Sequence, residues 1–412
     1  MGPARHARLF VTRLLGGAAV SLALAASPLG GCAGAGCPTP VPVASLPDSI
    51  RARLDLSPPP EVRVSRARQR NPNSDLIVRL AEHDTFRPGL RTEDRPVVLP
   101  MTSRGEHWTV PLTVVAINGQ ARVVNFKIDT GSHTQLSMDS RSANRLGVVV
   151  PAEITEGISH TAFGPKRVHT GVIAELRAPG AMLFAVEVAI DCSGRSYSPR
   201  IGIRLLERFG HAIFDWDART LTLLPRGWTS RTADATGREG WAALPWTADP
   251  VSLRRDSIEH EGDGRRRVLV EMASRWVRVS LDGTDRVTLL DTGFSGDVFA
   301  FEPMGVESRR KGTVVGQGFG RRDTFRTDEL ENPVRLVGAG PHLELDGLTL
   351  IGPTTDYGNM TLVERAGFEI MLGLGVLQRY PMWLDFERDE ARFWTGVGPI
   401  PMPVPMPSDA PD

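Results

Sequence analysis

The same short pattern occurs twice in this 412-residue chain, at positions 162 residues apart. At each place an apolar, strand-like run ends in the triplet Asp-Thr-Gly, first as Asp129-Thr130-Gly131 and again as Asp291-Thr292-Gly293. The glycine allows a sharp turn and a close approach of the backbone, and the threonine hydroxyl can donate a hydrogen bond. Two carboxylates are thus presented at strand ends in the same local geometry, so the repeat constrains the chain to two similar halves.

The sequence around each triplet predicts the same strands in both halves. Asparagine-glycine and aspartate-glycine pairs are strong signals for hairpin turns. Such turns, at residues 118–119 and 282–283, separate predicted strands at 108–117 and 121–128 in the first half and at 276–281 and 286–290 in the second. Each half also ends in a predicted hairpin, formed by 212–217 with 221–224 and by 382–387 with 391–394.

Helical periodicity is scarce in the chain. A helix is predicted at 140–146, where Asp139 is a suitable N-cap and Gly147 follows the last turn. Two shorter helices are predicted at 203–209 and 374–380. The remaining sequence alternates in short runs between turn signals, which is typical of an all-β architecture.

Each triplet is followed later in the chain by a short run that ends in glycine. These runs are Met371-Leu372-Gly373 and Arg200-Ile201-Gly202. Together with the triplets they make residues 105–396 resemble the retropepsin-like and pepsin-like aspartic proteases, although Arg200 replaces an apolar residue of the family pattern. The resemblance implies an all-β fold of two retropepsin-like (acid protease) β-barrel lobes, related by a pseudo-two-fold axis and carrying a few short helices.

The resemblance also implies that Asp129 and Asp291 form a catalytic pair. Two neighbouring carboxylates share one proton, and the aspartic protease dyad is the standard example of this coupling. The ionised member takes a proton from a water while the protonated member donates to the substrate carbonyl oxygen, which needs neither a cofactor nor a metal. The alternative interpretation is that each aspartate only accepts backbone hydrogen bonds in a strand-end turn.

The residues beside the two aspartates are expected to support the active-site loops. They are Thr130, Gly131, Ser132, Thr292, Gly293 and Ser295. Ser132 matches the family, in which a small hydroxyl residue bonds the outer carboxylate oxygen. Phe294 stands at the corresponding place in the second half, with Ser295 next to it, so a hydroxyl bond that orients Asp291 is not guaranteed.

Two glycine-containing segments lie where the family carries a flap over its substrate. They contain Gly164 in the first half, and Gly316, Gly318 and Gly320 in the second. A mobile hairpin tip suits a lid that excludes water and holds an extended peptide. The alternative interpretation for each segment is an ordinary surface turn.

The N-terminus predicts export. Arg5, Arg8 and Arg13 precede an apolar stretch at 14–26 that is too short to be a convincing membrane span. The run at 29–32 resembles a bacterial lipoprotein signal, which implies that Cys32 is lipidated and anchors the protein on the periplasmic or extracellular face of a membrane. The alternative is an ordinary cleaved secretory peptide. The expected divisions are a signal peptide at 1–31, a tether and extension at 32–104, lobes at 105–235 and 236–398, and a proline-rich tail at 399–412.

Charge and cysteine content limit which partners and metal sites are expected. Lys plus Arg and Asp plus Glu both number 48, and no basic stretch is interleaved with aromatic residues, so a nucleic-acid partner is not expected. Three cysteines show no metal-site spacing. If Cys32 carries lipid, then Cys37 and Cys192 either form a disulfide or remain as two free thiols.

The sequence as a whole predicts a membrane-tethered aspartic endopeptidase acting on peptide or protein substrates. Its two lobes are expected to form an internal pseudo-dimer in a monomeric chain. One alternative keeps the fold but is a catalytically inert peptide-binding lipoprotein, which is motivated by Phe294 and Arg200. A second alternative keeps the chemistry but pairs the lobes between two chains.

Overall fold

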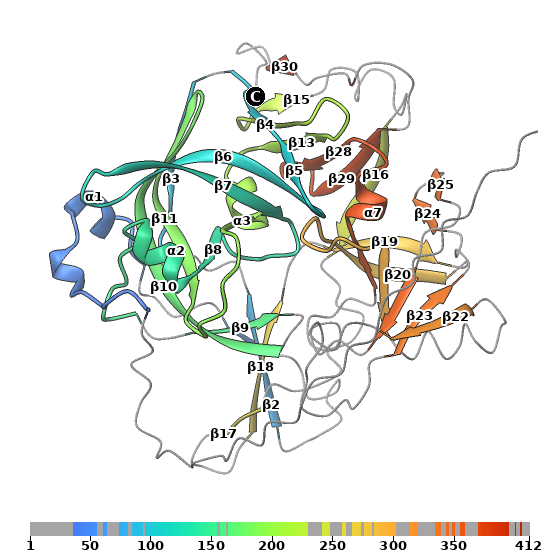
Figure 1. Cartoon of the computed structure of the whole chain (residues 1–412), viewed down its shortest axis with the longest axis horizontal. Helices are drawn as coiled ribbons and strands as arrows, with labels where there is room; N and C mark the ends of the chain where they lie inside the picture. The colour runs from blue at the N-terminus through green and yellow to red at the C-terminus, as the bar shows by residue number, and fades with distance from the viewer. Residues whose placement is uncertain are drawn as a thin grey trace, which may run out of the picture. The chain divides into compact units, whose positions relative to one another are not determined.

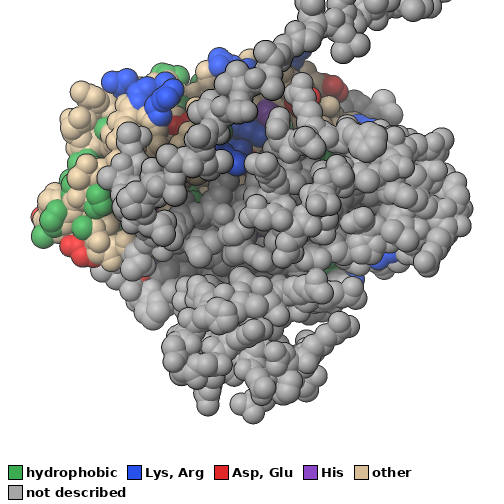
Figure 2. All heavy atoms as spheres, turned by 60° about the horizontal axis from the view of Figure 1, so that its bottom comes forward, with side chains coloured by type: hydrophobic (Ala, Val, Ile, Leu, Met, Phe, Trp, Pro, Cys, Tyr) green, Lys and Arg blue, Asp and Glu red, His purple; other side chains and the backbone are tan. Residues whose placement is uncertain are grey.

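The structure is a computed structural model of the chain (Figure 1). It describes residues 36–55, 61–63, 74–80, 85–93, 95–154, 157–161, 164–229, 241–247, 258–260, 266–272, 276–281, 284–301, 314–319, 334–338, 343–345, 348–350, 355–358, 370–394, 400 and 404–405. No helix in these ranges has the length and apolar character needed to cross a membrane. Figure 2 shows one face of the molecule, where Lys, Arg and His side chains gather in the middle of its upper part.

The first lobe is a nine-stranded sheet that closes on itself. Its strands follow the order β3-β11-β8-β12-β7-β6-β10-β9, with β5 beside β6, and an additional pairing of β10 with β11 closes the path into a barrel. The strands are β3 (Gly89–Thr92), β5 (Thr102–Arg104), β6 (His107–Val115), β7 (Ala121–Asp129), β8 (Leu136–Asp139), β9 (Gly157–Thr161), β10 (Gly164–Ala178), β11 (Ala181–Asp191) and β12 (Arg200–Gly202).

The second lobe repeats the same local arrangement around its own triplet. Strand β20 pairs antiparallel with β19 and parallel with β27, as β7 pairs antiparallel with β6 and parallel with β12 in the first lobe. The strands of this lobe are β19 (Trp276–Leu281), β20 (Thr284–Leu290), β21 (Val298–Phe301), β22 (Val314–Phe319), β23 (Val334–Gly338), β24 (Leu343–Leu345), β25 (Leu348–Leu350), β26 (Thr355–Gly358) and β27 (Ile370–Leu372).

The hairpins that end the two halves pair with each other and join the lobes. Strand β13 of the first half lies antiparallel to β28 of the second, with Ile213 opposite Trp383. The joined strands run in the order β16-β29-β28-β13-β14-β4 within a 15-stranded sheet that continues into the second lobe. They are β4 (Val97–Pro100), β13 (His211–Asp215), β14 (Thr220–Leu224), β16 (Trp241–Thr247), β28 (Met382–Asp385) and β29 (Glu390–Trp394).

Two smaller sheets and five short helices complete the described structure. Strands β1 (Glu61–Arg63), β2 (Ser74–Leu80), β18 (Arg266–Met272) and β17 (Ile258–His260) form a four-stranded sheet, and β15 (Trp228–Thr229) pairs with β30 (Val404–Pro405). The helices are η1 (Val43–Ser45), α1 (Asp48–Arg51), α2 (Ser140–Arg145), α3 (Ile203–Leu206) and α7 (Leu374–Leu377). The predicted fold class, two β lobes with a few short helices, is confirmed.

The core of the described structure is continuous through both lobes. Buried side chains of β6, β7, β8 and β11 pack with those of β13, β14 and β28 in one cluster, which includes Phe126, Leu136, Phe214, Met382 and Leu384. Apolar burial of this extent is the dominant stabilising contribution to such a fold. It gives the strand ends that carry the two triplets a rigid base.

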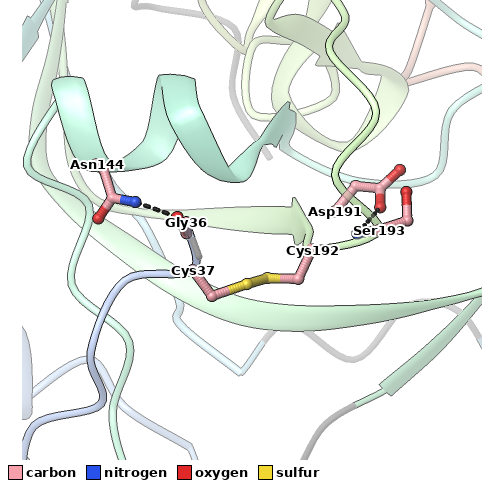
Figure 3. The surroundings of a disulfide bond; sticks show 6 residues. All are labelled: Gly36, Cys37, Asn144, Asp191, Cys192 and Ser193. Atoms are coloured by element: carbon pink, nitrogen blue, oxygen red, sulfur yellow. Dashed lines mark hydrogen bonds between the residues drawn. A yellow bond between two sulfur atoms is a disulfide. The ribbon is translucent and has the colours of Figure 1, made fainter. Parts of the chain in front are cut away.

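The segment 36–55 differs from the free tether expected from its composition. It forms η1 and α1, and Leu46 and Ile50 are buried against Phe86 and Val172 of the first lobe. A disulfide joins Cys37 to Cys192 at the end of β11, with their Cα atoms 5.7 Å apart (Figure 3). Composition alone missed this packing because the few apolar residues here show no periodicity, and they find their partners only in the folded lobe.

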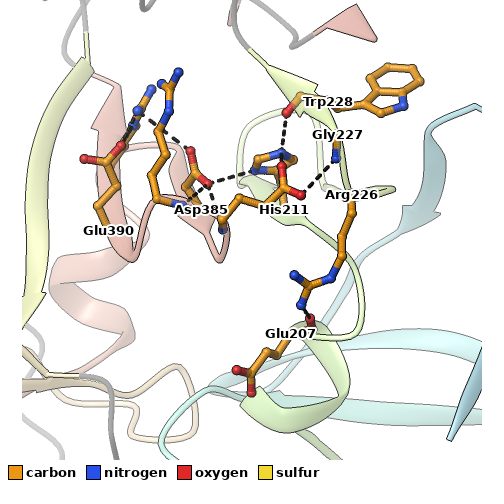
Figure 4. Close-up of polar contacts among 10 residues, drawn as sticks. Glu207, His211, Arg226, Gly227, Trp228, Asp385 and Glu390 are labelled. Carbon is orange, nitrogen blue, oxygen red and sulfur yellow. Dashed lines mark hydrogen bonds and ion pairs between the residues drawn. The ribbon is translucent and has the colours of Figure 1, made fainter. Parts of the chain in front are cut away.

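A buried polar cluster lies across the junction between the two halves (Figure 4). His211 of β13 is buried, and its Nδ1 atom lies 3.2 Å from Oδ1 of Asp385 on β28. The Nε2 atom of His211 contacts the carbonyl oxygen of Trp228 at 2.5 Å. Arg392 contacts the other oxygen of Asp385 at 3.7 Å. Polar groups from both halves are therefore matched to one another inside the joining sheet.

Candidate active site

The two Asp-Thr-Gly loops are held at the same place in each lobe by a parallel strand. Gly202 of β12 lies opposite Asp129 in the pairing of β12 with β7. In the second lobe the backbone N–H of Asp291 donates to the carbonyl oxygen of Leu372 at 2.9 Å. A Cβ atom on Gly202 would lie 2.0 Å from the carbonyl oxygen of Thr134, so glycine is required for this close packing.

The two loops are joined by hydrogen bonds of their threonines. The hydroxyl of Thr130 accepts a hydrogen bond from the backbone N–H of Thr292 at 3.0 Å, and the hydroxyl of Thr292 accepts one from the N–H of Thr130 at 3.0 Å. Each hydroxyl also donates across the interface, from Thr130 to the carbonyl oxygen of Leu290 at 2.7 Å and from Thr292 to that of Ile128 at 3.1 Å. The four bonds are buried and symmetric, so they fix the relative position of the loops.

The aspartate of each loop faces the glycine of the other. A Cβ atom on Gly131 would lie 2.4 Å from Cγ of Asp291, and one on Gly293 would lie 2.3 Å from Oδ1 of Asp129. Any side chain at either position would collide with the carboxylate. The two carboxylates also hydrogen-bond to each other, which is one of the contributions to the raised pKa of Asp291. The structure therefore brings Asp129 and Asp291 together within one chain.

The surroundings of Asp291 favour its protonated form. The pKa of Asp291 is raised to about 7, first because burial disfavours its charge and next because the charge of Asp129 repels it. The backbone N–H of Gly293, which donates to Asp291 Oδ1 at 2.7 Å, and the charge of Lys127 oppose this shift. Asp291 is thus the member of the pair that carries a proton at mildly acidic pH.

Three basic side chains surround Asp129. Arg200 donates from Nη1 to the Oδ2 atom of Asp129 at 2.8 Å. The Nζ atom of Lys127 donates to the carbonyl oxygen of Gly293 at 2.8 Å and lies 3.2 Å from Nε2 of His107. Burial lowers the pKa of Lys127 and of His107 from their usual values, and the charge of Lys127 lowers that of His107 further. The site therefore combines a carboxylate pair with fixed positive charge.

These basic residues share one face of the sheet. Arg200 lies opposite Lys127 and Gly202 opposite Asp129 in the pairing of β12 with β7. Residues two apart in a strand point to the same side, so Arg200, Lys127 and Asp129 project together. Sequence reasoning noted Arg200 only as a departure from the family pattern and gave Lys127 and His107 no role. The available signal was a cation two residues before the triplet aspartate, at Lys127, and another two residues before Gly202, at Arg200.

The residues that follow the triplets have the same backbone contacts but different side-chain roles. The N–H groups of Ser132 and Phe294 donate to the carbonyl oxygens of Asp129 and Asp291 at 3.0 and 3.2 Å. The hydroxyl of Ser132 pairs with that of Thr134 at 2.9 Å, while Arg200 occupies Oδ2 of Asp129.

The Phe294 ring packs beside Gly296 and Gly373 and meets Phe299 edge-on, with ring centroids 6.3 Å apart. Ser295 is partly buried in the loop that follows. Phe294 therefore supports its loop by apolar packing.

The two flap segments fall in paired strands. Gly164 begins β10 and lies opposite Thr161 of β9, so a hairpin is present where the first flap was predicted. Gly316 and Gly318 lie within β22, opposite Val337 and Arg335 of β23, and therefore not at a hairpin tip as expected. Gly320 lies outside the described residues, as does the lipidation candidate Cys32.

One further group of candidate metal ligands occurs in the described part of the chain. Ligand atoms of Cys37, His169 and Cys192 lie within 4.8 Å of one another. The two sulfur atoms are joined in the disulfide, so neither is available as a thiolate ligand. The disulfide within this group instead links segment 36–55 to the first lobe.

Comparison with known proteins adds a family match. The sequence model of the family described as "Aspartyl protease" matches residues 113–193, which run from within β6 to just past the end of β11 and include Asp129. No curated protein matches the chain. The solved aspartic proteinase from Irpex lacteus is similar at 10% identity over 74% of this chain and 98% of that chain, with a TM-score of 0.42. Basic 7S globulin from soybean is similar at 12% identity over 74% of this chain and 96% of that chain, with a TM-score of 0.39.

Proposed function

We propose that this chain, which belongs to the aspartyl protease family by its match at residues 113–193, is an aspartic endopeptidase. It hydrolyses peptide bonds with a water activated by Asp129 and Asp291. The observation that carries the proposal is the meeting of both triplets at one place, where each carboxylate faces the opposite glycine. A pair of strand-end turns with no shared chemistry would not need the four crossed threonine bonds.

The unequal environments of the two carboxylates assign their roles. Asp129 faces Arg200, which stabilises its ionised form, whereas the proton resides on Asp291, whose pKa is about 7. Asp129 accepts a proton from the attacking water as the water oxygen bonds to the scissile carbonyl carbon, and Asp291 donates its proton to the carbonyl oxygen. The tetrahedral intermediate then collapses. The proton on Asp129 passes to the leaving nitrogen, the C–N bond breaks, and Asp291 regains its proton from the intermediate.

The test of this proposal is peptide cleavage by the full mature protein and by two variants, Asp129→Asn and Asp291→Asn. Both variants should lose cleavage by a factor of at least about 10³, because neither carboxylate can act as base and acid alone. The double variant should lose little more than either single one, since the pair acts as a unit. Retention of full activity by Asp291→Asn, with loss in Asp129→Asn, would show that the two carboxylates do not share the reaction.

A second candidate function follows from the ion pair at Asp129. Arg200 donates to Oδ2 of Asp129, so in this state it competes with a water for that oxygen. A protein in which this ion pair never opens would bind peptides without cleaving them. Cleavage of no peptide by the wild-type protein between pH 3 and 8, together with measurable peptide binding, would favour this inert alternative.

We further propose that the mature protein is exported and anchored to a bacterial membrane by lipid on Cys32, and that its two lobes form a complete site within one monomer. The apolar stretch and the run before Cys32 support the anchor. Cys32→Ala should move the protein from the detergent-requiring to the soluble fraction or leave it unprocessed. Mass spectrometry that finds an unmodified N-terminus at another residue would contradict the anchor, and solution mass measures the oligomeric state.

A further inference from the structure

The basic side chains beside the carboxylate pair carry more positive charge than the ionised carboxylate of the pair balances. Lys127 and Arg200 bring two cations to the site, while Asp129 supplies one ionised carboxylate and Asp291 holds the proton. The Lys127 ammonium is bonded by a carbonyl oxygen and lies near a histidine nitrogen, and neither group is anionic. Glu106 lies close enough to influence Lys127 and His107, but it is exposed, so water screens its charge.

The guanidinium of Arg200 is only partly used by its contact with Asp129. Nη1 donates to Asp129, and the plane of the group lies over the ring of Tyr197 with Cζ 4.9 Å from the ring centroid. The Nε atom is buried and has no hydrogen-bond partner among the residues that the structure describes. A buried donor without an acceptor costs free energy. The Nε side of the guanidinium is thus an unfilled binding edge next to the catalytic pair.

The rest of the Arg200 side chain is partly open to solvent, although Nε itself is buried. The Arg200 side chain is 33% exposed, whereas that of Asp129 is 7% exposed. An arginine fork that remains partly open matches a carboxylate, which it can bind through two parallel N–H donors. An apolar peptide side chain would instead leave the Nε donor without a partner.

We propose that Arg200 is a specificity-determining residue that binds a carboxylate of the peptide substrate next to the scissile bond. This proposal rests on the proposed peptidase function. The incoming carboxylate draws the guanidinium toward itself and away from Asp129, so Oδ2 of Asp129 becomes available to the attacking water. Substrate binding and release of the catalytic carboxylate are then coupled, and substrates without a negative charge are cleaved slowly because the ion pair with Asp129 persists.

The test compares matched peptides that differ only in one residue beside the scissile bond, with glutamate, glutamine or leucine at that position. The wild-type protein should show a kcat/KM at least about tenfold higher for the glutamate peptide than for the glutamine peptide, as expected for a charge-assisted bond to arginine. Arg200→Leu should bring this ratio to about one, by lowering cleavage of the glutamate peptide and raising that of the glutamine peptide. Arg200→Lys should retain part of the preference.

Arg177→Leu provides a matched control in the same lobe. Arg177 is a partly exposed arginine of β10 that is ion-paired with Glu175, away from the carboxylate pair. This variant should keep the wild-type ratio. A wild-type preference for leucine or glutamine over glutamate, or a ratio unchanged in Arg200→Leu, would overturn the assignment. Thermal unfolding of each variant checks that Arg200→Leu folds, and Arg200→Gln serves as the substitute if it does not.

The substrate carboxylate can be that of an acidic side chain or that of the peptide C-terminus, and two sets of peptides distinguish these sources. Peptides with an internal glutamate and an amidated C-terminus test a side-chain carboxylate. Peptides with glutamine and a free C-terminus placed next to the scissile bond test the terminal carboxylate. A tenfold preference in only one of these sets identifies the source, whereas its absence from both contradicts the proposal.

A binding measurement separates this inference from the proposed activity. Asp291→Asn keeps the contact between Arg200 and Asp129 but should not cleave, so fluorescence anisotropy can measure its affinity for labelled glutamate and glutamine peptides. Tighter binding of the glutamate peptide, lost when Arg200→Leu is added, supports the carboxylate site even if no peptide is cleaved. Equal binding of both peptides, together with cleavage by the wild-type protein, would sink the specificity role and leave the peptidase function standing.

Discussion

At the scale of single residues, the two triplets are identical in sequence but unequal in the fold. Asp129 accepts a bond from a guanidinium at Oδ2, whereas Asp291 accepts one from a backbone N–H at Oδ1 and has its pKa raised to about 7, chiefly by burial. The repeat predicted that the carboxylates would meet. It could not predict which one holds the proton, because that depends on burial and on Arg200, which reaches Asp129 only through the pairing of β12 with β7.

This inequality predicts the alkaline limit of activity. Cleavage requires the proton on Asp291, so kcat/KM should fall about tenfold per pH unit above about pH 7. The charge of Lys127 lowers the pKa of Asp291. Lys127→Met should therefore move the alkaline limb to higher pH, while Lys127→Arg should leave it near the wild-type position. A limb that moves to lower pH in Lys127→Met would contradict this electrostatic role.

The same group predicts how stability depends on pH. The pKa of Asp291 is higher in the folded protein than its ordinary value of 3.8, so its contribution to stability is fully present below about pH 4 and is lost as the pH rises through about 7. Asp291→Asn removes the titrating proton. Urea unfolding from pH 4 to pH 8 should therefore show a smaller loss of stability in Asp291→Asn than in the wild-type protein, and an equal or steeper loss would contradict the assignment.

At the scale of structural elements, the sequence correctly predicted the helices and hairpins whose ends are set by local signals such as N-cap and turn residues. The helix α2 begins after Asp139, whose carboxylate accepts the N–H of Ser142 at 2.6 Å, and it ends before Gly147 at a φ of 65°. The hairpins β6–β7 and β13–β14 also lie where turn signals placed them. By contrast, the packing of segment 36–55 and the crossed loop contact depend on residues more than 100 positions away, which no local pattern reports.

The crossed loop contact predicts a large cost for losing one hydroxyl. Thr130→Val keeps the shape of the side chain but leaves the N–H of Thr292 and the carbonyl oxygen of Leu290 without their partner. Unsatisfied buried groups cost about 1–3 kcal/mol each, so the variant should lose about 2–6 kcal/mol of unfolding free energy, together with activity. Thr130→Ser retains the hydroxyl and should lose much less. Equal losses in both variants would show that the methyl group, not the hydroxyl, supports the loops.

At the scale of the whole molecule, the sequence predicted two closing hairpins but not that they pair with each other. Their pairing joins the halves through β13 and β28 and places both catalytic loops within one chain. This pairing depends on side chains whose role is visible only once the two strands lie side by side. His211 and Asp385 are opposite each other in this register and are both buried, so each supplies the polar partner that the other needs inside the sheet.

This junction makes Asp385 a test of how the halves are held together. Burial would raise the pKa of Asp385, but the contact with His211, the backbone N–H of Arg388 and the charge of Arg392 outweigh it and lower the pKa. The stabilisation is therefore present above the ordinary pKa of about 4 and is lost as the pH falls through the lowered value. Asp385→Asn should cost about 3 kcal/mol at pH 7, because it breaks a buried charged contact, and this difference from the wild-type protein should shrink toward pH 3.

The repeat itself supplies the control for this experiment. Asp215 occupies the same place in the first closing hairpin, where its Oδ1 atom accepts the N–H of Ala218 at 2.9 Å, and Asp385 accepts the N–H groups of Glu387 and Arg388 at 3.1 Å in the second. Asp215→Asn thus removes a turn carboxylate that is only partly buried. Urea unfolding of both variants at pH 7 and pH 3 should show the larger and more pH-dependent loss in Asp385→Asn. Equal losses at both pH values would mean that the carboxylate stabilises only its own turn, and that the continuous apolar core, rather than the pair across β13 and β28, holds the two halves together.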